Sequence, residues 1–157
     1  MITTKEQIIE YFKSGIKDQK NFKIGIEHEK FLFNKQDDKR INYSKIKQMF
    51  SALVEFGWNP ILEKDNIIGL NKGGKNITLE PGNQIELSGD KLTNIHEACA
   101  ESQDYLFELR QVTKKLDIKI VSAGFDPISK LSEVSNNPKQ RYQLMTKHMP
   151  LGGELSL

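Results

Sequence analysis

A strict alternation of polar and apolar side chains over residues 76–88 constrains this chain more than any other feature of its sequence. In the string NITLEPGNQIELS, isoleucine and leucine occupy every second position on both sides of a central Pro-Gly-Asn. A period of two is typical of a strand with one buried face, and Pro-Gly-Asn is a turn sequence. We therefore predict an antiparallel hairpin in which Glu80 pairs with Gln84 and Thr78 lies opposite Glu86.

A second segment, KIGIEHEKFLF at residues 23–33, alternates in the same way. Glu27 and Glu29 share one parity, whereas His28 shares the other with apolar residues, which favours a partly buried histidine. Carboxylates two residues apart on a strand lie ~6.6 Å apart at Cα and repel each other unless a cation or solvent relieves them. With Glu80 and Glu86, they indicate a carboxylate-lined sheet that could hold more than one Mg²⁺. A solvated, charged outer face is the alternative.

Hydrophobic periodicity and turn residues predict the remaining elements. We expect a first helix that begins with a capping box of Thr3 and Glu6 and ends at Gly15. Further helices are expected over residues 43–56, 93–116 and 141–148, the last stopping before Pro150. Further strands are expected over residues 58–63, 66–70 and 119–124, followed by an irregular loop over 125–138.

Composition excludes several classes of protein. The 157 residues carry 23 Lys and Arg against 21 Asp and Glu, so there is no polybasic arm and we expect no nucleic-acid partner. No run of apolar residues is long enough to cross a membrane, and the N-terminus lacks a secretory signal, so we expect a soluble, cytoplasmic chain with no membrane partner. One cysteine and three histidines cannot build a zinc finger.

Residues 69–75 fit the pattern G-x-x-x-x-G-K of a phosphate-binding loop, but the context argues against one. Such a loop needs Ser or Thr next and must open a helix, whereas Asn76 follows and begins a predicted strand. We therefore interpret residues 71–75 as a glycine-rich turn and Lys72 as a solvated lysine.

Two further side chains could carry chemistry. Cys99 falls on the apolar stripe of the 93–116 helix, which predicts a buried thiol. Arg141 could clamp a carboxylate or phosphate, since its planar guanidinium matches these anions, or it could be an ordinary surface arginine.

Four strings occur in order between residue 25 and the last residue: GIEHEKF, GLNKGGKNITLEPGNQIELSG, HEACAE and KQRYQLMTKHMP. Together they resemble glutamate–cysteine ligase of the plant and proteobacterial type. The resemblance implies an α+β, glutamine-synthetase-like fold with an antiparallel sheet flanked by helices. It also implies ATP-dependent ligation of the γ-carboxylate of L-glutamate to L-cysteine through γ-glutamyl phosphate, the first step of glutathione biosynthesis. ATP would be bound with Mg²⁺ and without a phosphate-binding loop.

The resemblance also implies roles for individual residues. The glutamates that match the family are expected to be metal ligands: Glu27, Glu29, Glu80 and Glu86. Gln84, Arg141 and Tyr142 are expected to contact substrate, with Arg141 as the catalytic residue that faces an anionic group. Cys99 matches a cysteine that can enter a regulatory disulfide. The chain also departs from the family: Asn83 replaces an expected glycine, Ser129 an expected tryptophan and His148 an expected tyrosine. The departures at Ser129 and His148 concern the substrate wall.

The family continues well beyond the last residue of this chain. We therefore expect residues 1–157 to be the N-terminal part of a single catalytic domain, with a sheet that is incomplete at the C-terminus and little ligase activity alone. A related carboxylate–amine ligase with another substrate and a non-catalytic binding remnant of the fold remain alternatives. The sequence predicts no oligomeric state.

Overall fold

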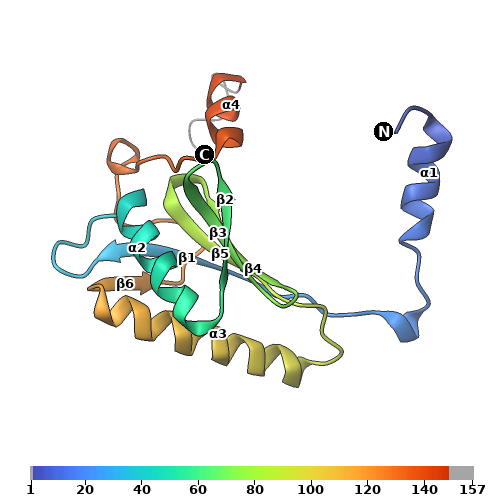
Figure 1. The fold of residues 1–157 in the computed structure, drawn as a ribbon, viewed down its shortest axis with the longest axis horizontal. Coiled ribbons are helices and arrows are strands. Elements are labelled where there is room, and N and C mark those ends of the chain that lie inside the picture. Colours follow the sequence, from blue (N-terminus) through green and yellow to red (C-terminus); the bar gives the residue numbers. More distant parts are fainter. Residues whose placement is uncertain (1, 149–157) are drawn as a thin grey trace.

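A single antiparallel sheet organises residues 2–148, the part of the chain that the computed structural model describes (Figure 1). Its six strands follow the order β2-β3-β4-β5-β1-β6. They are β1 (Glu27–Asn34), β2 (Asn59–Glu63), β3 (Asn66–Lys72), β4 (Lys75–Glu80), β5 (Gln84–Ser88) and β6 (Ile118–Val121). The α-helices are α1 (Lys5–Ser14), α2 (Tyr43–Leu53), α3 (Ile95–Lys115) and α4 (Gln140–His148). The α+β architecture with an antiparallel sheet is confirmed.

The predicted hairpin has the register that the alternation indicates. In the β4–β5 pair, Glu80 lies opposite Gln84 and Thr78 opposite Glu86. The turn is a short 3₁₀ segment, Pro81–Asn83, in which Gly82 and Asn83 adopt φ of 64° and 63°. Glycine tolerates this left-handed region, and Asn tolerates it better than most other residues. The segment after the 71–75 turn is strand β4 and not a helix, so the rejection of a phosphate-binding loop is confirmed.

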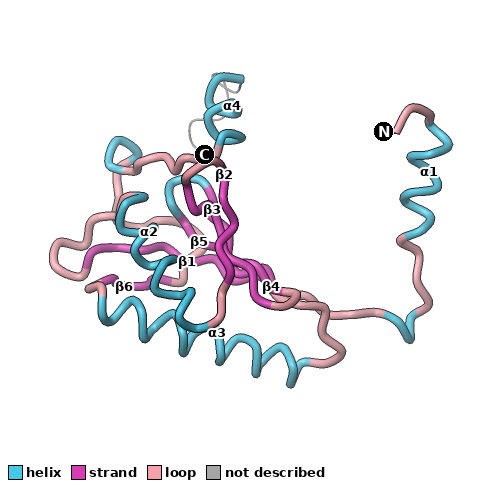
Figure 2. The backbone as a smooth tube through the Cα atoms, viewed as in Figure 1, coloured by secondary structure: helices cyan, strands magenta, loops and turns pink. Residues whose placement is uncertain are grey.

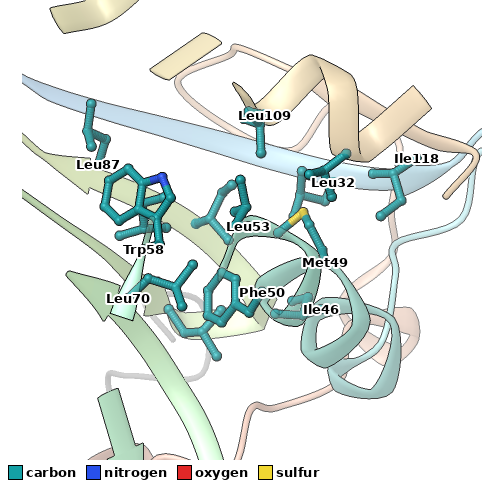
Figure 3. Close-up of a cluster of buried hydrophobic side chains, with 14 of the residues drawn as sticks. Leu32, Ile46, Met49, Phe50, Leu53, Trp58, Leu70, Leu87, Leu109 and Ile118 are labelled. Atoms are coloured by element: carbon teal, nitrogen blue, oxygen red, sulfur yellow. The ribbon is translucent and has the colours of Figure 1, made fainter. Parts of the chain in front are cut away.

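Helices α2 and α3 pack on the apolar face of the sheet and form the core with it. Figure 3 shows Met49, Phe50 and Leu53 of α2 beside Trp58 and other side chains of the cluster. The sheet contributes fully buried side chains from its central strands: Leu32, Leu70, Ile77, Leu79, Ile85 and Leu87. Because apolar side chains alternate along these strands, this packing leaves the glutamates on the opposite face.

Lys72 is more constrained than the sequence suggested. Its Nζ lies 2.5 Å from Oε1 of Glu108 on α3, and the other oxygen of Glu108 accepts the indole N–H of Trp58 at 2.7 Å. The lysine is therefore half-buried and paired with a carboxylate of the fold, so it is neither freely solvated nor directed at an anionic ligand.

The N-terminal helix differs from the prediction in its cap and its packing. Its capping box is formed by Thr4 and Gln7, one residue later than the predicted Thr3 and Glu6, because the helix begins at Lys5. None of its side chains is buried, and Tyr11 and Phe12 are 69% and 72% exposed. Figure 2 shows a long connection, mostly loop, between α1 and the sheet.

The third helix corrects the prediction for Cys99. The helix begins at Ile95 with Asn94 as its cap, and its buried positions include Ala98, Glu101 and Tyr105. Cys99 follows Ala98 by one residue, about 100° around the helix, and its thiol is exposed instead of buried. Glu101 on the same helix is buried, and its carboxylate accepts the backbone N–H of Asp90 after β5.

Helix α4 is described as far as His148, so its expected end before Pro150 lies outside the described residues. None of the helices within residues 2–148 is both long and apolar enough to cross a membrane.

Two neighbouring residues at the end of α2 test this core. Leu53 is fully buried, whereas Val54 is 42% exposed. We expect Leu53→Ala to lower the free energy of unfolding by about 2–5 kcal/mol, since it leaves a cavity among close-packed side chains. Val54→Ala should change it by less than ~0.5 kcal/mol. Urea denaturation followed by far-ultraviolet circular dichroism measures both, and equal effects would contradict the assigned packing.

Candidate functional site

Four glutamates lie on the face of the sheet that faces away from the core. Glu29 of β1 pairs with Glu86 of β5, and Glu86 pairs with Thr78 of β4. Glu27 and Glu80 occupy the neighbouring rows, opposite Ser88 and Gln84 respectively. Side chains in paired rows two residues apart share a face, so the register places all four carboxylates together on three adjacent strands.

Two of these carboxylates are only half engaged by neighbours. Glu29 accepts a hydrogen bond from the Gln84 amide at 2.6 Å through Oε2. Glu86 accepts one from the Ser88 hydroxyl at 2.9 Å through Oε1. No protein hydrogen bond to the second oxygen of either glutamate, or to the Glu27 carboxylate, is found within residues 2–148. The oxygens available to a cation therefore come from β1 and β5.

The crowding of negative charge has an electrostatic consequence at Glu86. Burial raises the pKa of this carboxyl group above its usual value, and the charges of Glu80, Glu27 and Glu29 raise it further. The hydrogen bond from Ser88 acts in the opposite direction. A cation placed on this face would relieve the repulsion.

Glu80 has a different environment from the other three glutamates. Its two oxygens accept hydrogen bonds from Thr78 at 3.1 Å and from the hydroxyl of Tyr142 at 2.7 Å. Arg141 also lies 3.7 Å from it. The structure therefore engages both oxygens of Glu80 with protein groups, mainly from the start of α4.

Arg141 and Tyr142 join α4 to this end of the sheet. Burial, together with the hydrogen bond to Glu80, raises the pKa of Tyr142 to about 12, so its hydroxyl stays a donor. The Arg141 guanidinium lies 4.8 Å from the centroid of the tyrosine ring and donates to its hydroxyl at 3.0 Å. Its side chain is still 64% exposed, which leaves donors free for an anion.

The donor set suits a cation that is shared with a ligand better than one enclosed by protein. Residues 2–148 contain no group of three or more His, Cys, Asp and Glu side chains arranged to hold a metal ion. Mg²⁺ is commonly bound by only one or two carboxylates, with water and phosphate oxygens completing its octahedron. The partly free oxygens of Glu29 and Glu86 fit that mode of binding.

A pocket of about 530 Å³ adjoins the carboxylate face. Its walls come from the sheet, the 81–83 turn and the loop after β6: Glu29, Phe31, Arg40, Glu80, Pro81, Gly82, Gln84, Gly124, Phe125, Asp126, Ser129, Leu131 and Val134. Its size is in the range of pockets that hold small molecules. Two of the departures from the family, Asn83 and Ser129, lie in this region. Ser129 lines the pocket, and Asn83 donates from the turn to the carbonyl and hydroxyl oxygens of Ser135 at 2.8 and 2.9 Å.

Sequence reasoning missed one interaction beside this pocket, the ion pair between Arg40 and Asp126. Its N···O distance is 2.8 Å, and the Arg40 side chain is only 4% exposed. The Asp126-Pro-Ile-Ser sequence is a recognisable turn, and its carboxylate does accept backbone N–H groups of Ile128 and Ser129. Nothing local could have indicated the arginine, which lies 86 residues away in the chain.

The remaining candidate side chains lie away from the carboxylate face. His28 is hydrogen-bonded to Ser102 at 3.0 Å and stacks on Tyr105, as expected for a satisfied, partly buried histidine. Burial and the charge of Lys30 lower its pKa, which favours the neutral form of the ring. Cys99 lies on α3, across the sheet from the glutamates.

Comparison with known proteins identifies the family. Residues 23–157 match the model of glutamate-cysteine ligase family 2. The chain belongs to this family. It is 41% identical over 155 residues to chloroplastic glutamate–cysteine ligase A of Oryza sativa subsp. japonica, 39% to the chloroplastic enzyme of Medicago truncatula and 37% to that of Arabidopsis thaliana.

The alignments to glutamate–cysteine ligases cover nearly all of this chain but a minority of each relative. Each covers 98% of the chain, and 32%, 30% and 30% of the three relatives. The chain thus spans about a third of the length of the curated relatives that it matches. All the candidate site residues lie within the range that matches the family model.

The crowding of carboxylates predicts that the charge of Glu86 lowers the stability of the fold. Because its pKa is raised in the folded state, its ionisation opposes folding as pH rises through that pKa. We expect Glu86→Gln to raise the free energy of unfolding at pH 7 by roughly 0.2–1 kcal/mol, the usual size of a like-charge effect between paired strands. Glu55→Gln, at an exposed position after α2, should have no effect. Chemical denaturation at pH 7 without divalent cations measures both, and destabilisation by Glu86→Gln would contradict the prediction.

Proposed function

We propose that this chain carries part of the active site of an ATP-dependent ligase that joins the γ-carboxylate of L-glutamate to L-cysteine through γ-glutamyl phosphate. The observation that supports it is the common face of Glu27, Glu29, Glu80 and Glu86, in a chain of glutamate-cysteine ligase family 2. A glutamine-synthetase-like sheet and a role in the first step of glutathione biosynthesis are part of the proposal. So is a cytoplasmic location, although the relatives are named as chloroplastic.

The proposed division of labour follows the hydrogen bonds. Glu27, Glu29 and Glu86 keep free carboxylate oxygens, so they would hold Mg²⁺, which when bound neutralises the charge of the transferring phosphate. Glu80 would act mainly through Tyr142 and Arg141, keeping the exposed guanidinium beside the carboxylate face, where it can contact an anionic group. Gln84 orients Glu29 through the 2.6 Å hydrogen bond and also lines the pocket, where it can contact substrate.

A related ligase with another amine substrate is the second candidate. Ser129 lines the pocket, where the resemblance predicts a tryptophan, and the smaller side chain leaves more room for an amine with a larger side chain. A non-catalytic remnant is less well supported, because clustered carboxylates cost stability unless they bind a cation. We place residues 1–157 in one catalytic domain, of which they form the N-terminal part.

Binding of Mg²⁺ is the first test. We expect MgCl₂ to raise the melting temperature, by roughly 2–4 °C for each 1 kcal/mol of binding linkage, when compared with NaCl of equal ionic strength. Glu27→Gln combined with Glu29→Gln should abolish the increase. The matched control is Glu6→Gln with Glu55→Gln, which removes two exposed carboxylates elsewhere and should leave the increase intact. An increase that survives in the Glu27/Glu29 variant would contradict the proposed metal site.

Turnover is the second test. Since the chain spans about a third of its relatives' length, we expect residues 1–157 alone to release little or no ADP when given ATP, Mg²⁺, L-glutamate and L-cysteine. A coupled ADP-release assay measures this, with a full-length plant relative as the positive control. Turnover at the rate of the full-length relative would show that the groups in this chain suffice.

A further inference from the structure

The loop over residues 122–135 forms one wall of the pocket beside the carboxylate face. Apart from a single 3₁₀ turn, Leu131–Glu133, it has no regular secondary structure. It still contributes Phe125, Ser129 and Val134 to the wall. A segment without a hydrogen-bonded ladder opens easily unless side chains anchor it, so its anchors decide whether the pocket keeps its shape.

Arg40 is the central anchor of this loop. Its guanidinium pairs with Asp126 at 2.8 Å and donates to the carbonyl oxygen of Gly82 in the turn between β4 and β5. It also lies over the rings of Phe31 and Phe33 of β1, at 4.9 and 5.7 Å from their centroids. One buried side chain thus joins β1, the β4–β5 turn and the loop.

Asp126 organises the loop from the other side of the ion pair. Burial opposes its ionisation, but hydrogen bonds from the backbone N–H groups of Ser129 and Ile128 and from Arg40 hold its pKa at about 2. The carboxylate is therefore charged throughout the physiological range. It shapes the turn that presents Ser129 to the pocket and binds that turn to Arg40.

Contacts of the 81–83 turn support the same docking. Asn83 donates two hydrogen bonds to Ser135. Gly82 has φ of 64°, and a Cβ atom there would lie 2.7 Å from the Val134 side chain, so the loop packs directly on the glycine. The turn that connects the glutamate-bearing strands β4 and β5 is therefore also the surface on which the loop rests.

We propose that Arg40 and Asp126 are positioning residues of the site: their buried ion pair docks the 122–135 loop on β1 and the β4–β5 turn, and so fixes the shape of the pocket beside Glu29 and Gln84. The docking follows from these contacts alone. Its effect on substrate binding rests on the function proposed above.

Hydrogen–deuterium exchange of the 157-residue chain tests the docking. Arg40→Gln and the milder Asp126→Asn should each speed exchange of the 122–135 amides about tenfold or more, while β4 and β5 exchange as before. Arg40→Lys keeps the charge but not the fork of donors, and should restore part of the protection.

The matched control for the ion pair is Lys119→Gln. It breaks the ion pair between Lys119 on β6 and Asp38. The N···O distance of this pair, 2.7 Å, is similar, but both side chains are exposed. The control should leave the loop unchanged. Unchanged loop exchange in both Arg40→Gln and Asp126→Asn, or acceleration of the core strands to the same degree, would overturn the proposal.

A second measurement asks whether the docking matters for a ligand. L-glutamate with MgCl₂ is titrated into the chain, and binding is followed by NMR through the amide signals of Gln84 and Ser129. Asp126→Asn should weaken binding about tenfold, the lower end of the usual effect of removing a supporting contact, and Lys119→Gln should leave the affinity unchanged. Equal affinity in Asp126→Asn would overturn the positioning role. No binding by the unchanged chain would count against the proposed function, and the exchange result would then decide the docking alone.

Discussion

Burial of one face of the sheet under α2 and α3 is the constraint on which the rest of this structure depends. Leucine and isoleucine at every second position of β4 and β5 must face the helices, because exposing them would forfeit the main driving force of folding. The intervening positions are thereby committed to the other face. The glutamates lie together because they occupy these outward-facing positions, and not because they attract one another. Burial of the core supplies the free energy that holds the like charges side by side.

That arrangement leaves a mixed electrostatic surface. The carboxylates of Glu29 and Glu86 lie in one row of the sheet, where burial, together with the charges of the neighbouring glutamates, raises the pKa of Glu86. One strand away, Glu80 is matched by donors from Thr78 and Tyr142, with Arg141 nearby. In the proposed function, the negative region would hold the cation of a metal–phosphate complex and the exposed guanidinium would contact its anion.

The parts of the fold that could be predicted are those that local patterns control. Alternation indicated the β4–β5 register to the residue, and with it the shared face of Thr78, Glu80, Gln84 and Glu86. Helix faces were less predictable, because the three- and four-residue steps of α3 are compatible with either Ala98 or its neighbour Cys99 facing inward. Tertiary contact decided between them.

Long-range pairs between loops could not be predicted at all. Arg40 and Asp126 each sit in a stretch whose composition is ordinary for a surface loop, and only the folded sheet brings them together. The apolar side chains of α1 show the opposite limit: they belong to a helix that the sequence predicts, but no described part of the chain covers them. In both cases the local sequence indicates the secondary structure around a side chain but not its tertiary contacts.

The single tryptophan gives this molecule an intrinsic fluorescent probe that reports on only one face of the sheet. Trp58 is buried among core side chains, and its indole N–H is held by Glu108 on α3. The carboxylates and the pocket lie across the sheet from it, so a ligand that settles there without disturbing the helices should leave its emission spectrum unchanged. A shift of that emission on adding a ligand would therefore signal movement transmitted through the sheet itself.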